Sequence, residues 1–106
     1  MGNWLNYYVH VQEKWSRKTF GSARRTKGLI DHIQKELKEI ENDPTDLKEW
    51  IDIMILAMDG YWRHGGRSED LMRMLQDKQR VNISRKWPQP ISEDKAVEHI
   101  REDKLD

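Results

Sequence analysis

Two pairs of acidic residues are the part of this 106-residue chain best suited to chemistry. Glu36 and Glu39 form the first pair, and Glu49 and Asp52 form the second. On a helix, residues three positions apart have Cβ atoms about 5–6 Å apart, so both carboxylates of a pair can reach one cation. The chain has no cysteine, and an all-oxygen ligand set suits Mg²⁺ first and Mn²⁺ second. The spacing therefore predicts a divalent metal site held by these four carboxylates.

The second pair lies on a markedly apolar segment. Apolar side chains between Trp50 and Met58 cover most of a helix circumference, which predicts a buried helix. Four charged residues nevertheless form a narrow stripe along it: Glu49, Asp52, Asp59 and Arg63. Buried carboxylates are costly unless they are paired or bind a metal, which favours the metal site. In the alternative interpretation the acids form salt bridges with basic residues: Arg25, Lys27 and Arg63.

Charge is also segregated along the chain, although the net charge is zero. Residues 14–30 hold six cations and no acid, whereas residues 31–52 hold eight acids and three lysines. Carboxylates for a metal beside cations for an anion are what a metal-bound polyphosphate needs, although charge runs also mark solvated helix faces. The candidates for binding such a substrate are mostly basic: Lys27, His32, Lys35, Lys78, Asn82 and Arg85. His32 is equally consistent with a surface residue, and the last three equally with a helix that runs past the core.

The elements that must position these residues are predicted to be helical throughout. Apolar residues recur at helical spacing, and no segment alternates with period two, so no sheet is expected. The four main helices are expected at residues 4–18, 26–42, 46–63 and 68–86, with a short last helix from Ser92. Thr26, Ser68 and either Asp43 or Thr45 are the expected caps.

The first helix is expected to face the core with its apolar residues: Trp4, Tyr8, Val11 and Trp15. Only 36% of the residues are hydrophobic, so the single bundle of residues 1–106 is expected to be completed by oligomerisation. No apolar run approaches the length of a membrane span and no secretory signal is found, which predicts a cytoplasmic protein without a membrane partner.

Several ordered motifs are similar to those of a known family: Ser16–Gly21, Arg25–Gly28, Asp31–Ile40, Asp43–Asp46, Glu49–Asp52, Leu56–Gly60 and Trp87-Pro88. Glu36-x-x-Glu39 with Glu49-x-x-Asp52 resembles the signature of the all-α, MazG-like nucleotide pyrophosphohydrolases. The longer motifs resemble the dATP/dGTP diphosphohydrolase family within that superfamily, which includes the MazZ enzymes and is frequent in phages and prophages. Lys35 stands where many members of the superfamily have a second Glu, so the number of metal ions stays open.

This resemblance implies a metal-dependent hydrolase that is a homodimer or homotetramer. Its substrate would be a (deoxy)purine nucleoside triphosphate, dGTP/GTP or dATP, cleaved between the α and β phosphates to the monophosphate and pyrophosphate. The four carboxylates would serve as catalytic and metal-binding residues, with Glu39 as the candidate for orienting the attacking water. The pocket walls are expected to draw on Trp15, Phe20 and Trp87. A phage or prophage origin would place the protein in the host cytoplasm.

Two other functional classes remain as alternatives. The first is a non-enzymatic helical protein-interaction module or small phage regulator, in which the acids are surface charges. The second is a nucleic-acid binder that uses the basic block between Lys14 and Lys27. It is disfavoured because no recognition helix is apparent and the neighbouring acidic helix would repel phosphates.

Overall fold

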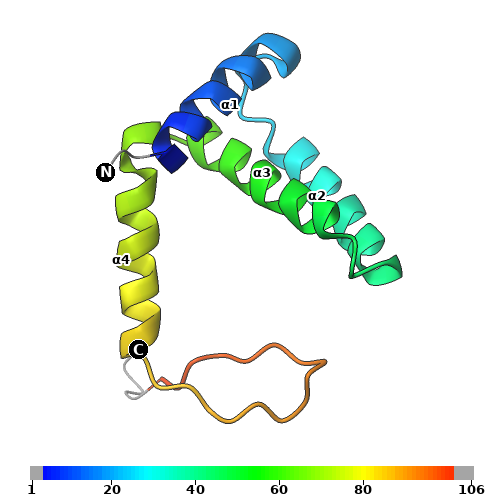
Figure 1. Cartoon of the computed structure of the whole chain (residues 1–106), viewed down its shortest axis with the longest axis vertical. Helices are drawn as coiled ribbons and strands as arrows, with labels where there is room; N and C mark the ends of the chain where they lie inside the picture. The colour runs from blue at the N-terminus through cyan, green and yellow to red at the C-terminus, as the bar shows by residue number, and fades with distance from the viewer. Residues whose placement is uncertain (1–3, 102–106) are drawn as a thin grey trace. The chain divides into compact units, whose positions relative to one another are not determined.

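The computed structural model describes residues 4–101, and within them all regular structure is helical (Figure 1). The elements are α1 (Trp4–Phe20), α2 (Thr26–Asn42), α3 (Leu47–Arg63), the short 3₁₀ helix η1 (Ser68–Asp70) and α4 (Leu71–Ser84). These described residues include no β-strand. The predicted all-α class with four main helices is therefore confirmed.

Contacts divide the chain into two compact units, residues 1–72 and residues 73–106. In the first unit α2 packs along α3, and α1 contacts both α3 and η1. Val9, Trp62 and Leu71 form the buried apolar core, with partly buried neighbours packed against it. That the whole chain is one domain stays a prediction. None of the described helices combines the length and the apolar character that crossing a membrane requires.

A tight turn joins α2 to α3 and sets the start of α3. The backbone N–H of Asp43 donates to the Glu39 carbonyl at 3.0 Å and ends α2. Asp46 caps α3, because its carboxylate accepts the Lys48 backbone N–H at 3.2 Å. The predicted caps Asp43 and Thr45 were therefore wrong. Thr45 instead donates its hydroxyl to the Asp43 carboxylate at 2.9 Å and stabilises the turn itself.

The starts of α2 and α4 also differ from the predicted caps. Arg25 precedes α2 in the left-handed conformation, with φ 51° and no side-chain capping bond. The Thr26 hydroxyl is hydrogen-bonded to His64 at the end of α3 rather than to its own helix. Ser68 begins η1, which leads into α4. Neither Thr26 nor Ser68 is the helix cap that the sequence predicted.

The outward faces of α1 and α3 correct two predictions about the core. The face of α1 expected to be buried is exposed: Trp4, Tyr8, Val11 and Trp15. Its buried residues are Val9 and three polar ones that hydrogen-bond to other elements: Asn6, Gln12 and Ser16. Along α3, Trp50, Ile51 and Met54 are 50%, 49% and 55% exposed. Within this chain, then, α3 is not the fully buried helix that was expected.

The second unit holds most of α4 and a segment without regular structure at residues 85–101. The predicted helix from Ser92 is absent from this segment, where Ser92 begins a single turn through its hydroxyl and the Asp94 N–H. So short a helix is marginal unless another element packs on it. The Ile100 N–H instead donates to the Lys86 carbonyl at 2.7 Å, and the Trp87 indole N–H donates to the Asn82 carbonyl at 2.8 Å.

Candidate functional site

Three carboxylates from two helices meet in the first unit. Glu36 of α2 and Glu49 and Asp52 of α3 each place an oxygen within 4.8 Å of the other two. The turn at residues 43–46 and the packing of α2 along α3 bring them to the same place. Glu36 and Glu49 are partly buried, whereas Asp52 is exposed. We call this group the acidic cluster.

The acidic cluster lacks partners for its charge. One oxygen of Glu36 and one of Glu49 are buried without any hydrogen-bond partner. The pKa of Glu49 is raised, first by its hydrogen bond with Glu36, then by burial and by the charges of Glu36, Asp46 and Asp52. His32, one turn earlier on α2, places its Nε2 3.4 Å from a Glu36 oxygen. Unpaired oxygen ligands at this spacing fit a hard divalent cation.

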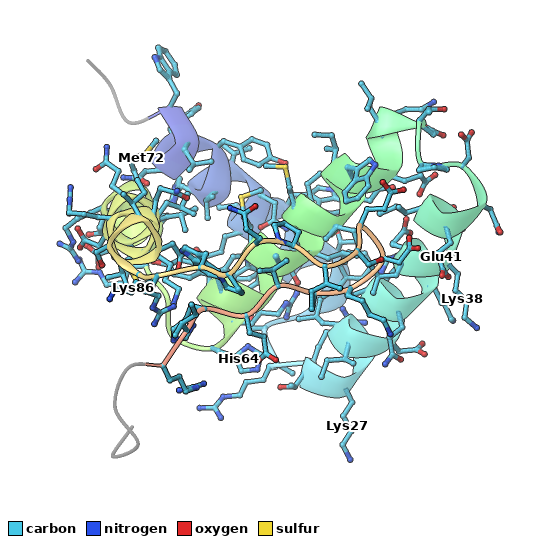
Figure 2. All side chains as sticks on the ribbon, turned by 90° about the horizontal axis from the view of Figure 1, so that it is seen from below. Lys27, Lys38, Glu41, His64, Met72 and Lys86 are labelled. Atoms are coloured by element: carbon cyan, nitrogen blue, oxygen red, sulfur yellow. The ribbon has the colours of Figure 1, made fainter. Side chains whose placement is uncertain are left out.

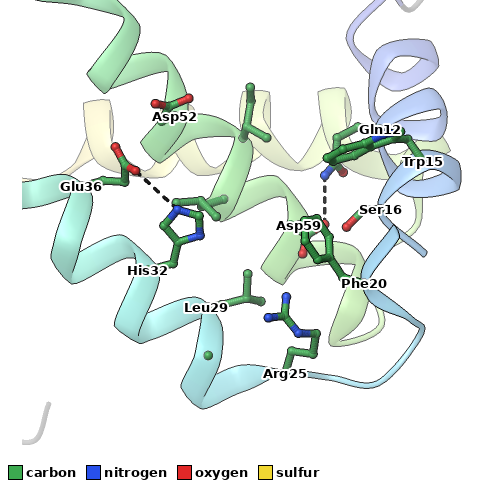
Figure 3. Close-up of a pocket in the computed structure, with 13 residues that line it drawn as sticks. Gln12, Trp15, Ser16, Phe20, Arg25, Leu29, His32, Glu36, Asp52 and Asp59 are labelled. Carbon is green, nitrogen blue, oxygen red and sulfur yellow. Dashed lines mark hydrogen bonds and ion pairs between the residues drawn. The ribbon is translucent and has the colours of Figure 1, made fainter. Parts of the chain in front are cut away.

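A cavity of about 260 Å³ opens beside the acidic cluster, between α1, α2 and α3 (Figure 3). Glu36 and Asp52 lie toward one end of it, and Trp15 and Phe20 of α1 lie toward the other. The two aromatic rings meet edge to face with centroids 5.5 Å apart. Leu29 forms part of the apolar wall. The cavity thus joins an anionic end to an aromatic end.

The aromatic end is bordered by a hydrogen-bonded polar network. The Trp62 indole N–H donates to Gln12 Oε1 at 2.8 Å, so the Gln12 amide N–H must face Asp59, to which it donates at 2.9 Å. Arg63 Nε donates to the other Asp59 oxygen at 2.6 Å. Burial would raise the pKa of Asp59, but hydrogen bonds from Ser16, Gln12 and Arg63 hold it below its ordinary value. Asp59 is therefore a charged acceptor at the cavity wall.

The buried Arg63 also fixes the loop between α1 and α2. Its Nη1 donates to the carbonyls of Gly21 at 2.9 Å and Ala23 at 2.6 Å, and its Nη2 donates to the Ser16 hydroxyl at 3.0 Å. Gly21 has φ 87°, a conformation that suits glycine. The loop that leads to Arg25 is in this way tied to both α1 and α3.

The predicted site residues divide into groups. Glu36, Glu49 and Asp52 come together, whereas Glu39, one turn further along α2, is exposed and outside the cluster. His32 lines the cavity. Lys27 is exposed and points away from the ribbon (Figure 2), and Lys35 pairs with Asp31 at 3.4 Å.

The remaining predicted residues belong to the second unit: Lys78, Asn82, Arg85 and Trp87. Within it, Arg85 Nη1 donates to Asn82 Oδ1 at 3.3 Å. The roles assigned to these residues stay predictions.

Residues that sequence reasoning did not assign to the site also line the cavity. Gln12, Ser16, Arg25 and Gly28 are among them. Gln12 and Ser16 flank Trp15 and are one helical turn apart, so a polar stripe beside the aromatic residue was a usable signal. Arg25 was weighed only as a salt-bridge partner, because its loop gives no periodicity from which to place a side chain.

Residues 8–106 match the sequence model of the dATP/dGTP pyrophosphohydrolase family. The chain belongs to this family. It is also similar to the "Eaa protein" of Salmonella phage P22, with 36% identity over 89 residues, which are 84% of this chain and 27% of that protein. The chain therefore spans about a quarter of the length of the phage relative. No solved structure matches. The family predicted from the motifs is confirmed.

Proposed function

We propose that the protein hydrolyses a (deoxy)purine nucleoside triphosphate, dGTP/GTP or dATP, between the α and β phosphates. The products are the nucleoside monophosphate and pyrophosphate. The observation that carries this proposal is the acidic cluster, in which one oxygen of Glu36 and one of Glu49 are buried without a partner. Glu36 and Asp52 of this cluster also line a cavity with an aromatic far end. Membership of a family described as pyrophosphohydrolases supports the same reaction class.

Glu36, Glu49 and Asp52 are the residues that would hold Mg²⁺ or Mn²⁺, with Glu39 as a fourth carboxylate from the next turn of α2. When bound there, a divalent cation would polarise phosphate oxygens and would neutralise the charge that develops on the leaving pyrophosphate. A hydrogen bond with Glu36 is the largest cause of the raised pKa of Glu49, and binding of a cation would favour the deprotonated carboxylate. Exposed Glu39 is also the candidate for orienting the attacking water, and His32 for holding Glu36 in place.

We assign the purine base to the Trp15 side of the aromatic end, because the Arg25 guanidinium already lies over the Phe20 ring. Trp15 offers a ring face to a purine, for which stacking is favourable. Asp59 is ionised and can only accept hydrogen bonds, while Gln12 keeps a second amide N–H to donate. Asp59 and Gln12 together suit a base edge that combines a hydrogen-bond donor with an acceptor. Adenine and guanine each have such an edge.

The reaction is tested by chromatography of the products formed from four ribo- and four deoxyribonucleoside triphosphates, with Mg²⁺ and with Mn²⁺. We expect monophosphate and pyrophosphate in equal amounts from a purine substrate. Release of orthophosphate in place of pyrophosphate would contradict the reaction class. Product formation that persists in Asp52→Asn would assign it to a contaminant or another site.

We also propose that the protein is a homodimer or homotetramer acting in the cytoplasm of a phage or prophage host, with no stable nucleic-acid partner. The exposed apolar residues of α1 and α3 support association: Trp4, Tyr8, Val11, Trp50, Ile51 and Met54. The phage relative supports the setting. Sedimentation at micromolar concentration checks the oligomeric state, and a monomer would contradict it.

The same exposed faces suit a second candidate function, a non-enzymatic helical protein-interaction module. This alternative predicts that neither Mg²⁺ nor a non-hydrolysable purine nucleotide stabilises the protein. A thermal melt with and without both ligands separates the two functions, because a ligand that binds only the folded state raises its stability.

A further inference from the structure

Arg25 is a cation at the cavity with no anionic partner. It lines the cavity together with Gly28, on the loop that leads into α2. Among residues 4–101 its guanidinium makes no ion pair and no hydrogen bond, and its contact is with the Phe20 ring, 5.3 Å from the centroid. Of the surface cations on α1 and α2, Arg17 and Lys35 each have a carboxylate partner, and neither lines the cavity. Arg25 is thus available to a ligand.

The backbone of Arg25 is held by its surroundings, and its exposed side chain lines the cavity. Its backbone is in the left-handed region, which is unfavourable for a residue other than glycine and persists only where the surroundings impose it. The Arg25 carbonyl accepts the Leu29 N–H at 2.8 Å, in the first turn of α2. Arg63 holds the preceding loop through the carbonyls of Gly21 and Ala23.

Space is kept open beside the guanidinium. Gly28 lies next to it, and a Cβ at that position would be 3.5 Å from Arg25 Nη2. A larger side chain would occupy the volume in which a ligand meets Arg25. Figure 3 shows the guanidinium directed toward the interior of the site, near Leu29, rather than outward.

The unmatched charges around the cavity are complementary in kind. Unpaired carboxylate oxygens call for a cation, and an unpaired guanidinium calls for an anion. A cation-bound phosphate chain supplies both charges in one ligand. The planar fork of N–H donors in arginine matches phosphate oxygens better than a lysine ammonium does.

We propose that Arg25 is a substrate-binding residue whose guanidinium binds the phosphate chain of the nucleotide, with Arg63 as the positioning residue for its loop. This inference rests on the proposed pyrophosphohydrolase function. It gives Arg25 the role that the sequence had suggested for Lys27, whose side chain is exposed and does not line the cavity.

The test compares Arg25→Ala and Arg25→Gln with Arg24→Ala. Arg24 is the adjacent exposed arginine and does not line the cavity, so its loss changes the net charge equally. We measure binding of inorganic tripolyphosphate by calorimetry in the presence of Mg²⁺, and KM and kcat for the purine substrate. Loss of one charge-assisted contact should weaken tripolyphosphate binding and raise KM by about 10- to 100-fold, with a smaller change in kcat. Arg24→Ala should stay within about twofold of wild type, and Arg25→Lys should recover part of the affinity.

Tripolyphosphate affinity that is unchanged in Arg25→Gln, or lowered equally in Arg24→Ala, overturns the proposal. Weakened binding of the nucleoside alone would mean that Arg25 contacts the base, which overturns it as well. Failure of the proposed reaction gives a different result. Wild type would then bind tripolyphosphate through Arg25 and release no pyrophosphate, whereas failure of this inference leaves hydrolysis intact in Arg25→Gln.

Discussion

Helix α3 carries two groups of charged residues that differ in their hydrogen-bond partners. Toward its start, Glu49 and Asp52 meet Glu36 and leave buried oxygens without partners. Toward its end, both oxygens of Asp59 accept hydrogen bonds, one from Gln12 and one from Arg63. The pKa of Glu49 is raised by its acidic neighbour Glu36, whereas three donors lower the pKa of Asp59.

The contrast is the one expected between a proposed ligand site and a structural ion pair. A buried carboxylate that the chain itself satisfies holds elements together, as Arg63 does by binding Asp59 and two loop carbonyls at once. A group of carboxylates without partners in the chain is stabilised only when a ligand binds to it. Burial of a carboxylate alone does not separate a ligand site from a structural ion pair. The number of hydrogen-bond donors to the carboxylate does.

The largest expected effect is on turnover at the acidic cluster. Asp52→Asn and Glu49→Gln each remove a charge that would hold the metal, and each should lower kcat/KM by at least about a hundredfold. Steady-state pyrophosphate release measures this, with circular dichroism to show that the helices are intact. The matched control is Glu41→Gln, an exposed acid on α2 that lies outside the cluster and should leave turnover unchanged.

The next effect is on stability, at the satisfied pair. Arg63→Met leaves Asp59 charged, buried and short of a donor, which should lower the free energy of unfolding by about 3–5 kcal/mol. Urea unfolding followed by circular dichroism measures the loss. Arg67→Ala breaks an exposed ion pair with Glu69 and should change stability little. Equal losses of stability in Arg63→Met and Arg67→Ala would contradict the structural role given to the buried Arg63–Asp59 pair.

Opposite pKa shifts predict opposite pH dependences. The lowered pKa of Asp59 stabilises the fold above the ordinary carboxylate range, and this contribution is lost as pH falls through the folded-state value. The raised pKa of Glu49 favours the protonated fold, so in the absence of metal stability is lost as pH rises through the folded-state value. The free energy of unfolding is measured by urea unfolding from about pH 3 to about pH 8. Asp59→Asn should reduce the loss of stability at low pH, and Glu49→Gln should reduce the loss of stability as pH rises. If both variants reduced the loss of stability on the same side of the pH range, the prediction would be contradicted.

A smaller expected effect concerns the fourth predicted carboxylate. Glu39 is exposed and lies outside the acidic cluster. If it orients the attacking water, Glu39→Gln should lower kcat by about a hundredfold, while Mg²⁺ affinity changes little. Parallel assays of turnover and Mg²⁺ binding check this. Normal turnover would remove Glu39 from the mechanism.

Local sequence patterns were sufficient for the helices and for the meeting of three acids. Apolar periodicity placed the four helices, and Asp43-Pro44 marked the turn between α2 and α3. Acids spaced at i, i+3 on either side of such a turn then bring Glu36 close to Glu49 and Asp52. These features depend on neighbours within a few residues of one another.

The rotation of α1 was not predictable in the same way. Its buried polar residues are held by partners far along the chain: Gln12 bonds Asp59, 47 residues away, and Asn6 bonds the Met72 N–H, 66 residues away. Apolar periodicity therefore selected Trp4 and Tyr8 as the inner face, although long-range hydrogen bonds turn them outward. Arg25 was missed for a related reason, because the loop before it is held by Arg63 from far along the chain rather than by local periodicity.

The most direct test of the account is calorimetric titration of Mg²⁺ into wild type and into Glu36→Gln, Glu49→Gln and Asp59→Asn. We expect wild type and Asp59→Asn to bind Mg²⁺ alike, since Asp59 already has its partners. The two cluster variants should lose binding, because they remove oxygens that the chain leaves unpaired. Undiminished Mg²⁺ binding in Glu36→Gln and Glu49→Gln would contradict the claim that the acidic cluster is a metal site.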